Sequence, residues 1–405
     1  MAEGGVRADA KRGKLRVLTL NNISGQGLQR LPASHYFAES AIDEPDAILV
    51  RSHNMHDLEV PSTVMAIGRA GAGTNNIPVA KMSERGVPVF NTPGANANAV
   101  KELVLAAMLI AARNLTGAVR FVETVEGSDE EINRVVEAAK KDFAGVELPN
   151  RTLGVIGLGK IGSLVADAAI RLGMNVWGYD PNITVDAAWS LPAQVHKANS
   201  IEQLLRKCEF LSVHVPLMES TRDLIDAGRL AMMTPGAVVL NFARDGVVNN
   251  EAVLAALREG KLKNYVCDFP SALLKQSDRV IAFPHLGAST REAEENCAVM
   301  VVDQVRDYLE HGNVRNAVNF PEVSMARESQ YRLGVANSNV PNMVGQISTA
   351  VAEAGLNIHN MINKSRDDMA YTLVDVDSAV PTGVIEAIRK IAGVLTVRYL
   401  PLESE

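Results

Sequence analysis

The chain is poor in cysteine: Cys208, Cys267 and Cys297 are the only three among its 405 residues. They are widely spaced and lie in apolar or helical contexts, which fits neither a disulfide framework nor a zinc motif. We therefore expect buried thiols and no metal site. The sequence also lacks a basic excess, since 40 Lys and Arg stand against 47 Asp and Glu for a net charge of −7. This balance argues against a nucleic-acid-binding surface.

Long apolar runs are absent too. No stretch approaches the roughly eighteen apolar residues of a membrane-spanning helix, so we expect no membrane partner. Residues 1–14 contain basic residues but no apolar core after them, and we expect a mobile tail rather than a signal peptide, in a cytoplasmic protein. A length of 405 residues suggests two or three domains.

What the sequence does contain is a glycine-rich turn between two strand-like runs. An apolar run at residues 153–156 precedes the turn, a helical pattern at 163–172 follows it, and a second β-rich run at 175–179 ends in Asp180. The glycines have G-x-G-x-x-G spacing, at Gly157, Gly159 and Gly162. On its own, this spacing often marks only a turn before a helix. Because it stands here between a strand and a helix, with Asp180 at the end of the next strand, the segment predicts dinucleotide binding.

Each part of this motif has a physical task. Gly157 allows the tight turn, Gly159 lets the backbone approach a pyrophosphate at the positive end of the helix, and Gly162 permits close packing. Asp180 can accept hydrogen bonds from both ribose hydroxyls, and its charge would repel a 2′-phosphate. The motif therefore favours NAD over NADP.

The region before this motif alternates short strands with helices, which predicts a second open parallel sheet. Its strand candidates are residues 16–20, 47–50, 65–69 and 87–91. Ligands bind beyond the carboxyl ends of such strands, and the candidates there are Arg51, Ser52, Arg69 and Gly73. The two arginines are placed to hold an anion, although ordinary surface arginines would give the same pattern.

Three further segments complete the predicted organisation. Residues 97–115 are apolar nearly all round, so we expect a helix buried between domains or subunits. The helical pattern at 291–310 returns the chain to the first domain, and the last segment has the order βαββαβ of a ferredoxin-like module. The expected fold is α/β, with two doubly wound parallel sheets and a ferredoxin-like domain. The expected domains are a substrate-binding domain at 15–98 and 296–319, an NAD-binding domain at 99–295 and a regulatory domain at 329–405.

Hydride transfer from an alcohol needs a base and a cation that holds the substrate. His285 follows the strand at 280–282, and Arg244 ends the strand at 237–243, so both are expected at the same sheet edge. A capping or core histidine and a surface salt bridge are the structural alternatives. His214 is expected to be packed and hydrogen-bonded, while His53 and His56 are secondary candidates.

The chain resembles the D-isomer-specific 2-hydroxyacid dehydrogenases, within them the branch that carries a C-terminal ACT domain. The resemblance covers nearly the whole chain past Lys14. It rests on residues 69–79, 91–109, 153–162, 213–217, 241–248, 284–296, 332–348 and 365–377.

The resemblance implies NAD-dependent oxidation of 3-phospho-D-glycerate to 3-phosphooxypyruvate, at the start of L-serine biosynthesis. It implies that His285 transfers the proton, that Arg244 anchors the substrate, and that Arg51 and Ser52 hold its phosphate end. Cofactor contacts are implied at Lys160, Ile161, Asp180, Pro216, Ala243 and Asp268. The residues themselves suggest one more at Gly287, where the missing side chain lets a cofactor or substrate come close to His285. An L-serine effector is implied at Asn337, Asn339 and Asn357. We expect a homodimer or homotetramer.

One residue departs from the family pattern. The glutamate that normally orients the catalytic histidine is replaced by Ala272, and no acid follows until Asp278. Loss of a comparable carboxylate from a serine-protease triad costs on the order of 10⁴ in rate. Two readings of this departure therefore stay open: another acid serves His285, or the protein is a slow dehydrogenase. The alternatives to the implied function are a dehydrogenase for another short D-2-hydroxy acid, and an NAD-binding, amino-acid-sensing protein whose turnover is weak because the glutamate is absent.

Overall fold

The computed structural model describes residues 13–402, so most of the tail expected at 1–14 lies outside the described residues. The described chain forms two compact units. One consists of residues 13–95 and 294–402, and the other is Asn96–Ala293. The first domain is therefore discontinuous in sequence, because the chain leaves it before Asn96 and returns at Glu294.

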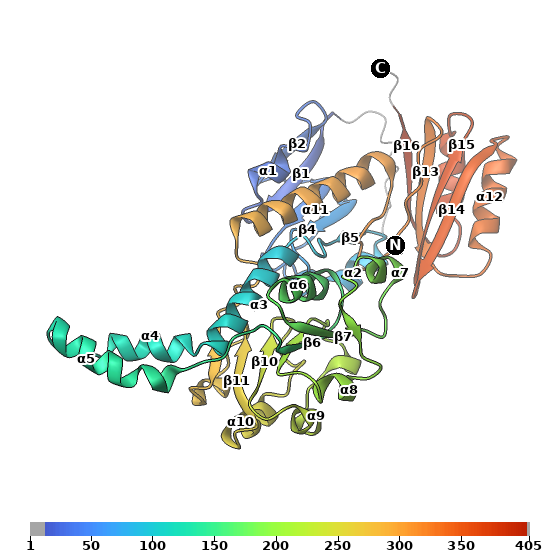
Figure 1. Ribbon diagram of the computed structural model, residues 1–405. Coiled ribbons are helices and arrows are strands. Elements are labelled where there is room, and N and C mark those ends of the chain that lie inside the picture. The colour runs from blue at the N-terminus through green and yellow to red at the C-terminus, as the bar shows by residue number, and fades with distance from the viewer. Residues whose placement is uncertain (1–12, 403–405) are drawn as a thin grey trace. The chain divides into compact units, whose positions relative to one another are not determined.

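The first unit contains a five-stranded parallel sheet with the order β2-β1-β3-β4-β5 (Figure 1). Its strands are β1 Leu15–Leu20, β2 Tyr36–Glu39, β3 Ala47–Val50, β4 Ala66–Arg69 and β5 Val89–Phe90. Its helices are α1 Gly25–Leu28, α2 Val79–Glu84 and α11 Arg291–His311. A Cβ on Gly68 would lie 2.7 Å from side-chain atoms of both Val301 and Val305, so the glycine lets α11 pack directly on β4. The edge strand β2 is absent from the sequence prediction.

The second unit is built on a seven-stranded parallel sheet with the order β12-β11-β10-β9-β6-β7-β8. The strands are β6 Thr152–Ile156, β7 Asn175–Tyr179, β8 His196–Lys197, β9 Phe210–Val213, β10 Ala237–Asn241, β11 Leu262–Cys267 and β12 Val280–Ala282. The helices are α6 Lys160–Arg171, α7 Val185–Trp189, α8 Ile201–Leu205, α9 Ala227–Met232 and α10 Asn250–Arg258, with short 3₁₀ turns η3 Glu219–Thr221 and η4 Leu274–Gln276. The strand order reverses between β6 and β9, the place where dinucleotides bind in such sheets.

A helical arm leads out of the second unit. α3 (Ala97–Ala112) is followed by α4 (Leu115–Glu123), α5 (Asp129–Ala139) and the 3₁₀ turn η2 (Lys140–Phe143), and α4 and α5 extend away from the sheet (Figure 1). Within the single chain α3 is buried on one side, where it packs mainly on α6: Val104 and Met108 are fully buried, but Leu109 is 43% exposed. Burial of the exposed side against another subunit stays a prediction.

No single helix of the described residues is long and apolar enough to cross a membrane, although α3 and α4 pass that test together as a pair bent by 67°.

The C-terminal segment forms the predicted ferredoxin-like module. β13 Tyr331–Ser338, α12 Met343–Glu353, β14 Ile358–Arg366, β15 Met369–Val376, α13 Thr382–Arg389 and β16 Val394–Pro401 give an antiparallel sheet of order β14-β15-β13-β16. Apolar residues of the strands and of both helices form its core, among them Leu333, Val335, Ile347, Val374 and Ile388. The expected fold class is confirmed for all three sheets.

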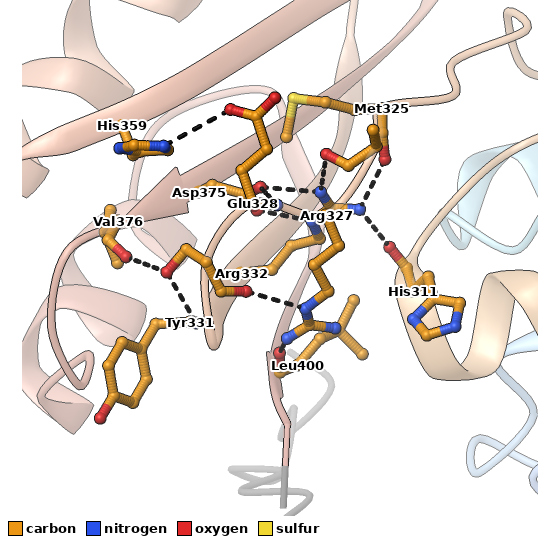
Figure 2. Close-up of polar contacts among 12 residues, drawn as sticks. His311, Met325, Arg327, Glu328, Tyr331, Arg332, His359, Asp375, Val376 and Leu400 are labelled. Atoms are coloured by element: carbon orange, nitrogen blue, oxygen red, sulfur yellow. Dashed lines mark hydrogen bonds and ion pairs between the residues drawn. The ribbon is translucent and has the colours of Figure 1, made fainter.

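Three arginines fasten this module to the end of α11. The guanidinium of Arg332, fully buried, pairs with the buried Asp375 and donates to the carbonyl oxygens of His311, Met325 and Ala326 (Figure 2). Arg398 donates to the carbonyls of Tyr308 and Leu309, and Arg327 donates to that of Glu310. These acceptors include the last carbonyls of a helix, which lack intrahelical partners and attract cations. The module is thus held by charge-assisted hydrogen bonds.

Candidate active site

The glycine-rich turn joins β6 to α6 as the spacing predicts. Gly157 has φ +88°, and a Cβ there would lie 2.8 Å from the carbonyl oxygen of His214, at the end of β9. A Cβ on Gly162 would lie 1.9 Å from the carbonyl oxygen of Gly157. Both positions therefore require glycine, one for conformation and packing and the other for packing alone.

The same turn fits a dinucleotide. A Cβ on Gly159 would meet no described atom within 4 Å, so the N-terminus of α6 is open on that side. Lys160 and Ile161 are the first residues of α6, and their N–H groups have no acceptor within the helix. Asp180 accepts hydrogen bonds from the N–H groups of Leu158 (2.9 Å) and Asn182 (3.0 Å), which fix its carboxylate beside the turn. These residues would hold the pyrophosphate and a ribose of NAD.

Arg244 follows β10 at the carboxyl edge of the sheet, and a buried asparagine shapes its loop. Asn241, 1% exposed, accepts from the N–H of Ala243 (3.1 Å) and donates to the carbonyl of Arg244 (3.0 Å). The side chain of Arg244 is exposed and donates to the Ala243 carbonyl at 2.7 Å. Asn241 is a positioning residue that the sequence reasoning missed, because an asparagine at a strand end gives no local signal of these bonds.

His285 follows β12 at the same edge and has an unusual backbone. Its φ is +58°, a left-handed conformation that histidine adopts more readily than most residues. The loop after it is held by Asp268, 2% exposed, which accepts from the N–H groups of Leu286 and Gly287, each at 2.7 Å. Asp268 is placed by the structure under the histidine loop, at the end of β11.

The imidazole of His285 has an aromatic neighbour in place of an acid. The ring of Phe269 lies edge-on to it, with centroids 5.3 Å apart. Ala272 is exposed, and between residues 13 and 402 no hydrogen bond to the imidazole of His285 is formed. Pro216 lies at the exposed end of the β9 segment, where its carbonyl accepts from Thr221, and Ala243 is buried beneath the Arg244 loop.

His214 is packed as expected rather than placed for catalysis. Its Nε2 lies 2.8 Å from the hydroxyl of Ser212, and burial lowers the pKa of His214 to about 4. As the pH falls, His214 is therefore protonated in the unfolded chain before it is protonated in the folded protein.

This lowered pKa predicts acid sensitivity. Stability from neutral His214 should be complete above about pH 6.5 and should be lost as the pH falls towards 4, by up to about 3 kcal/mol. Urea unfolding at pH 7 and pH 4.5 measures this loss, and His214→Gln should reduce it. If the free energy of unfolding fell by the same amount between pH 7 and pH 4.5 in both proteins, the lowered pKa of His214 would not be the cause.

The first unit contains the other predicted substrate residues. Arg51 and Ser52 follow β3, Arg69 ends β4, and the guanidinium of Arg69 folds over Gly71, where a Cβ would lie 1.6 Å from its Nη1. Gly73 lies two residues further along this loop. Arg51 Nη1 lies 2.8 Å from Glu294 Oε1 in the first turn of α11. His56 Nε2 lies 2.9 Å from the carbonyl oxygen of Asn75.

The three candidate effector residues do not come together within one module. Asn337 is fully buried and donates to the carbonyl of Ser338. Asn339 follows β13, while Asn357 precedes β14 next to Asp377. The pairings of Tyr331 with Val376 and of Ser338 with Met369 put these two asparagines at opposite ends of the sheet.

Known proteins resemble this chain in sequence and in fold. Residues 105–287 match the family described as D-isomer specific 2-hydroxyacid dehydrogenase, NAD binding domain. The chain is 32% identical to a D-3-phosphoglycerate dehydrogenase of Haemophilus influenzae, across 85% of this chain and 83% of that protein. It is 34% identical to the protein of that name from Methanocaldococcus jannaschii, of which it spans 59%.

Solved structures agree in fold. The NAD⁺-bound 3-phosphoglycerate dehydrogenase of Entamoeba histolytica has a TM-score of 0.59 and 24% identity, covering 75% of this chain and 98% of that one. Together with the dinucleotide turn and the paired edge loops, these similarities show that the chain belongs to the NAD-dependent D-isomer-specific 2-hydroxyacid dehydrogenases.

Proposed function

We propose that the protein oxidises 3-phospho-D-glycerate to 3-phosphooxypyruvate with NAD, the first step towards L-serine. The observation that carries the proposal is the placement of Arg244 and His285 after β10 and β12, at the edge of the sheet where the glycine turn also lies. Relatives named D-3-phosphoglycerate dehydrogenase support this substrate over the two alternatives.

Each of the candidate residues has a separate role in the proposed reaction. His285 takes the proton of the C2 hydroxyl, and Arg244 holds the carboxylate and the developing carbonyl. Arg51, Ser52, Arg69 and Gly73 hold the phosphate end. When bound, the cofactor supplies the hydride acceptor. Pro216, Ala243 and Gly287 remain proposed nicotinamide contacts, whereas Asp268 acts by anchoring the His285 loop.

The test is a comparison of substrates. NADH formation from 3-phospho-D-glycerate, D-glycerate and D-lactate gives kcat/KM for each. The proposal requires the phosphorylated acid to be preferred by at least about tenfold, because good charge-assisted contacts contribute about 1.5–3 kcal/mol. Equal values for the three acids would favour a dehydrogenase of another short D-2-hydroxy acid.

We also propose that L-serine binds the C-terminal module as an effector. One small amino acid cannot contact Asn339 and Asn357 of the same module, because an eight-residue strand of roughly 26 Å separates them. If both bind it, they come from two copies of the chain. Calorimetric titration of the full chain with L-serine tests this, and the absence of binding heat would contradict it.

We propose that the arm of α4 and α5 joins two copies of the chain. Leu115, Val119 and Val122 recur on one side of α4 and are 43%, 57% and 52% exposed. Val119→Glu should therefore separate the copies joined through the arm and lower the mass of the assembly, because it buries a charge in an apolar contact. Light scattering of both proteins measures the mass, and an unchanged oligomer would place the interface elsewhere.

A further inference from the structure

The arginine proposed to hold the phosphate end already has an anion beside it. Glu294 Oε1 lies 2.8 Å from Arg51 Nη1, and their side chains are 48% and 30% exposed. Glu294 belongs to the first turn of α11 and Arg51 to the loop after β3, so the pair joins two elements far apart in sequence. A phosphate held by Arg51, as proposed above, would therefore meet the carboxylate of Glu294 beside the same guanidinium.

A buried thiol shows which groups share this region. Cys297, one turn further along α11 and 5% exposed, lies in the fields of Arg51, Arg69 and Glu294. Burial raises the pKa of the Cys297 thiol, so it stays neutral and adds no charge. The charges of the three groups named here, two guanidiniums and one carboxylate, sum to +1.

We propose that Glu294 sets the charge of the substrate tail that this site accepts. The inference rests on the part of the proposed function that places the phosphate at Arg51. A phosphate monoester carries about −1.5 to −2 charges at pH 7 and meets a cluster of only +1. Neutralising Glu294 would raise the cluster to +2, which matches the dianion. The uncharged end of D-glycerate would be nearly indifferent to the same change.

The variant Glu294→Gln separates charge from orientation. Glutamine keeps an oxygen that can accept a hydrogen bond from Arg51 but carries no charge, whereas Glu294→Ala loses both. Exposed ion pairs contribute about 0.2–1 kcal/mol per pair, and a dianion feels the change nearly twice. We expect the Gln variant to bind 3-phospho-D-glycerate about three- to tenfold more tightly.

The experiment is calorimetric titration of the NADH-loaded protein, in which the hydroxy acid binds without turnover. Wild type, Glu294→Gln and Glu294→Ala are titrated with 3-phospho-D-glycerate and with D-glycerate. The inference is supported if the Gln variant binds 3-phospho-D-glycerate more tightly than the wild type does while its affinity for D-glycerate is unchanged. Steady-state kinetics with 3-phospho-D-glycerate should then show a lower KM at unchanged kcat.

Unchanged or weaker binding of the phosphorylated acid by the Gln variant overturns the inference, because Glu294 would then only orient Arg51. Failure of the proposed function looks different. In that case neither the wild type nor the Gln variant forms NADH from 3-phospho-D-glycerate, whatever the calorimetry shows.

Discussion

Replacing His285 by asparagine should lower kcat for NADH formation by about 10²–10⁴-fold, the contribution typical of a positioned acid or base. Asparagine is the informative choice because His285 has φ +58°, and asparagine tolerates this left-handed conformation. The anchor of the loop, from Asp268 to the N–H groups of Leu286 and Gly287, does not involve the imidazole. The variant therefore removes the proton-transfer group and keeps the loop.

The control is His359→Asn, an exposed histidine of the C-terminal module that lies 3.4 Å from Glu328. It should leave kcat unchanged, because His359 lies outside the residues proposed to bind the substrate and the cofactor. NADH affinity, measured by fluorescence titration, should be similar in all three proteins. A loss below tenfold in His285→Asn would mean that another group accepts the proton.

Replacing Asp375 by asparagine should lower the free energy of unfolding by about 3–5 kcal/mol, the cost of breaking a buried ion pair. Arg332 Nε lies 2.6 Å from Asp375 Oδ1 and Nη2 lies 2.8 Å from Oδ2, and both side chains are fully buried. An amide would turn an NH₂ group towards a guanidinium donor, so one charge would stay buried without its partner (Figure 2). Urea unfolding of the full chain measures the loss.

Glu328→Gln is the matched control for Asp375→Asn, because it also replaces a carboxylate by an amide. Glu328 pairs with His359 in the same region, but its side chain is 54% exposed. Glu328→Gln should lower the free energy of unfolding by less than about 1 kcal/mol, as for other surface ion pairs. If Asp375→Asn cost no more than Glu328→Gln, the buried pair would not stabilise the junction of the module with α11.

Features that depend on local geometry could be predicted from the sequence. Gly157 and Gly162 belong to one turn, and the structure gives each the constraint that the motif predicts. The parallel sheets follow from alternating strand and helix patterns, and the last module from its βαββαβ order. Arg244 and His285 could be singled out because residues after parallel strands meet at one edge.

Features that depend on distant partners could not be predicted. Asp268 anchors N–H groups eighteen and nineteen residues later, a pairing that no local pattern indicates. Arg332 lies in a strand, where sequence alone gives no reason for complete burial, and its carboxylate partner is 43 residues away. The exposed side of α3 depends on what surrounds the helix, which the apolar composition alone does not specify.

The position of Ala272 bears on whether this member of the family is an efficient enzyme. The family glutamate orients the histidine through its ring, whereas here the backbone of the loop is fixed by Asp268 and the ring contacts Phe269. We infer that these two contacts supply the orientation.

The most direct test of this account is NADH production from 3-phospho-D-glycerate at alkaline pH by the wild-type protein and by Ala272→Glu. We expect a wild-type turnover of about 1–10³ s⁻¹, as for ordinary enzymes, and no gain in the variant. A barely active wild type together with a strongly activated variant would contradict this account, because the missing carboxylate would then limit catalysis.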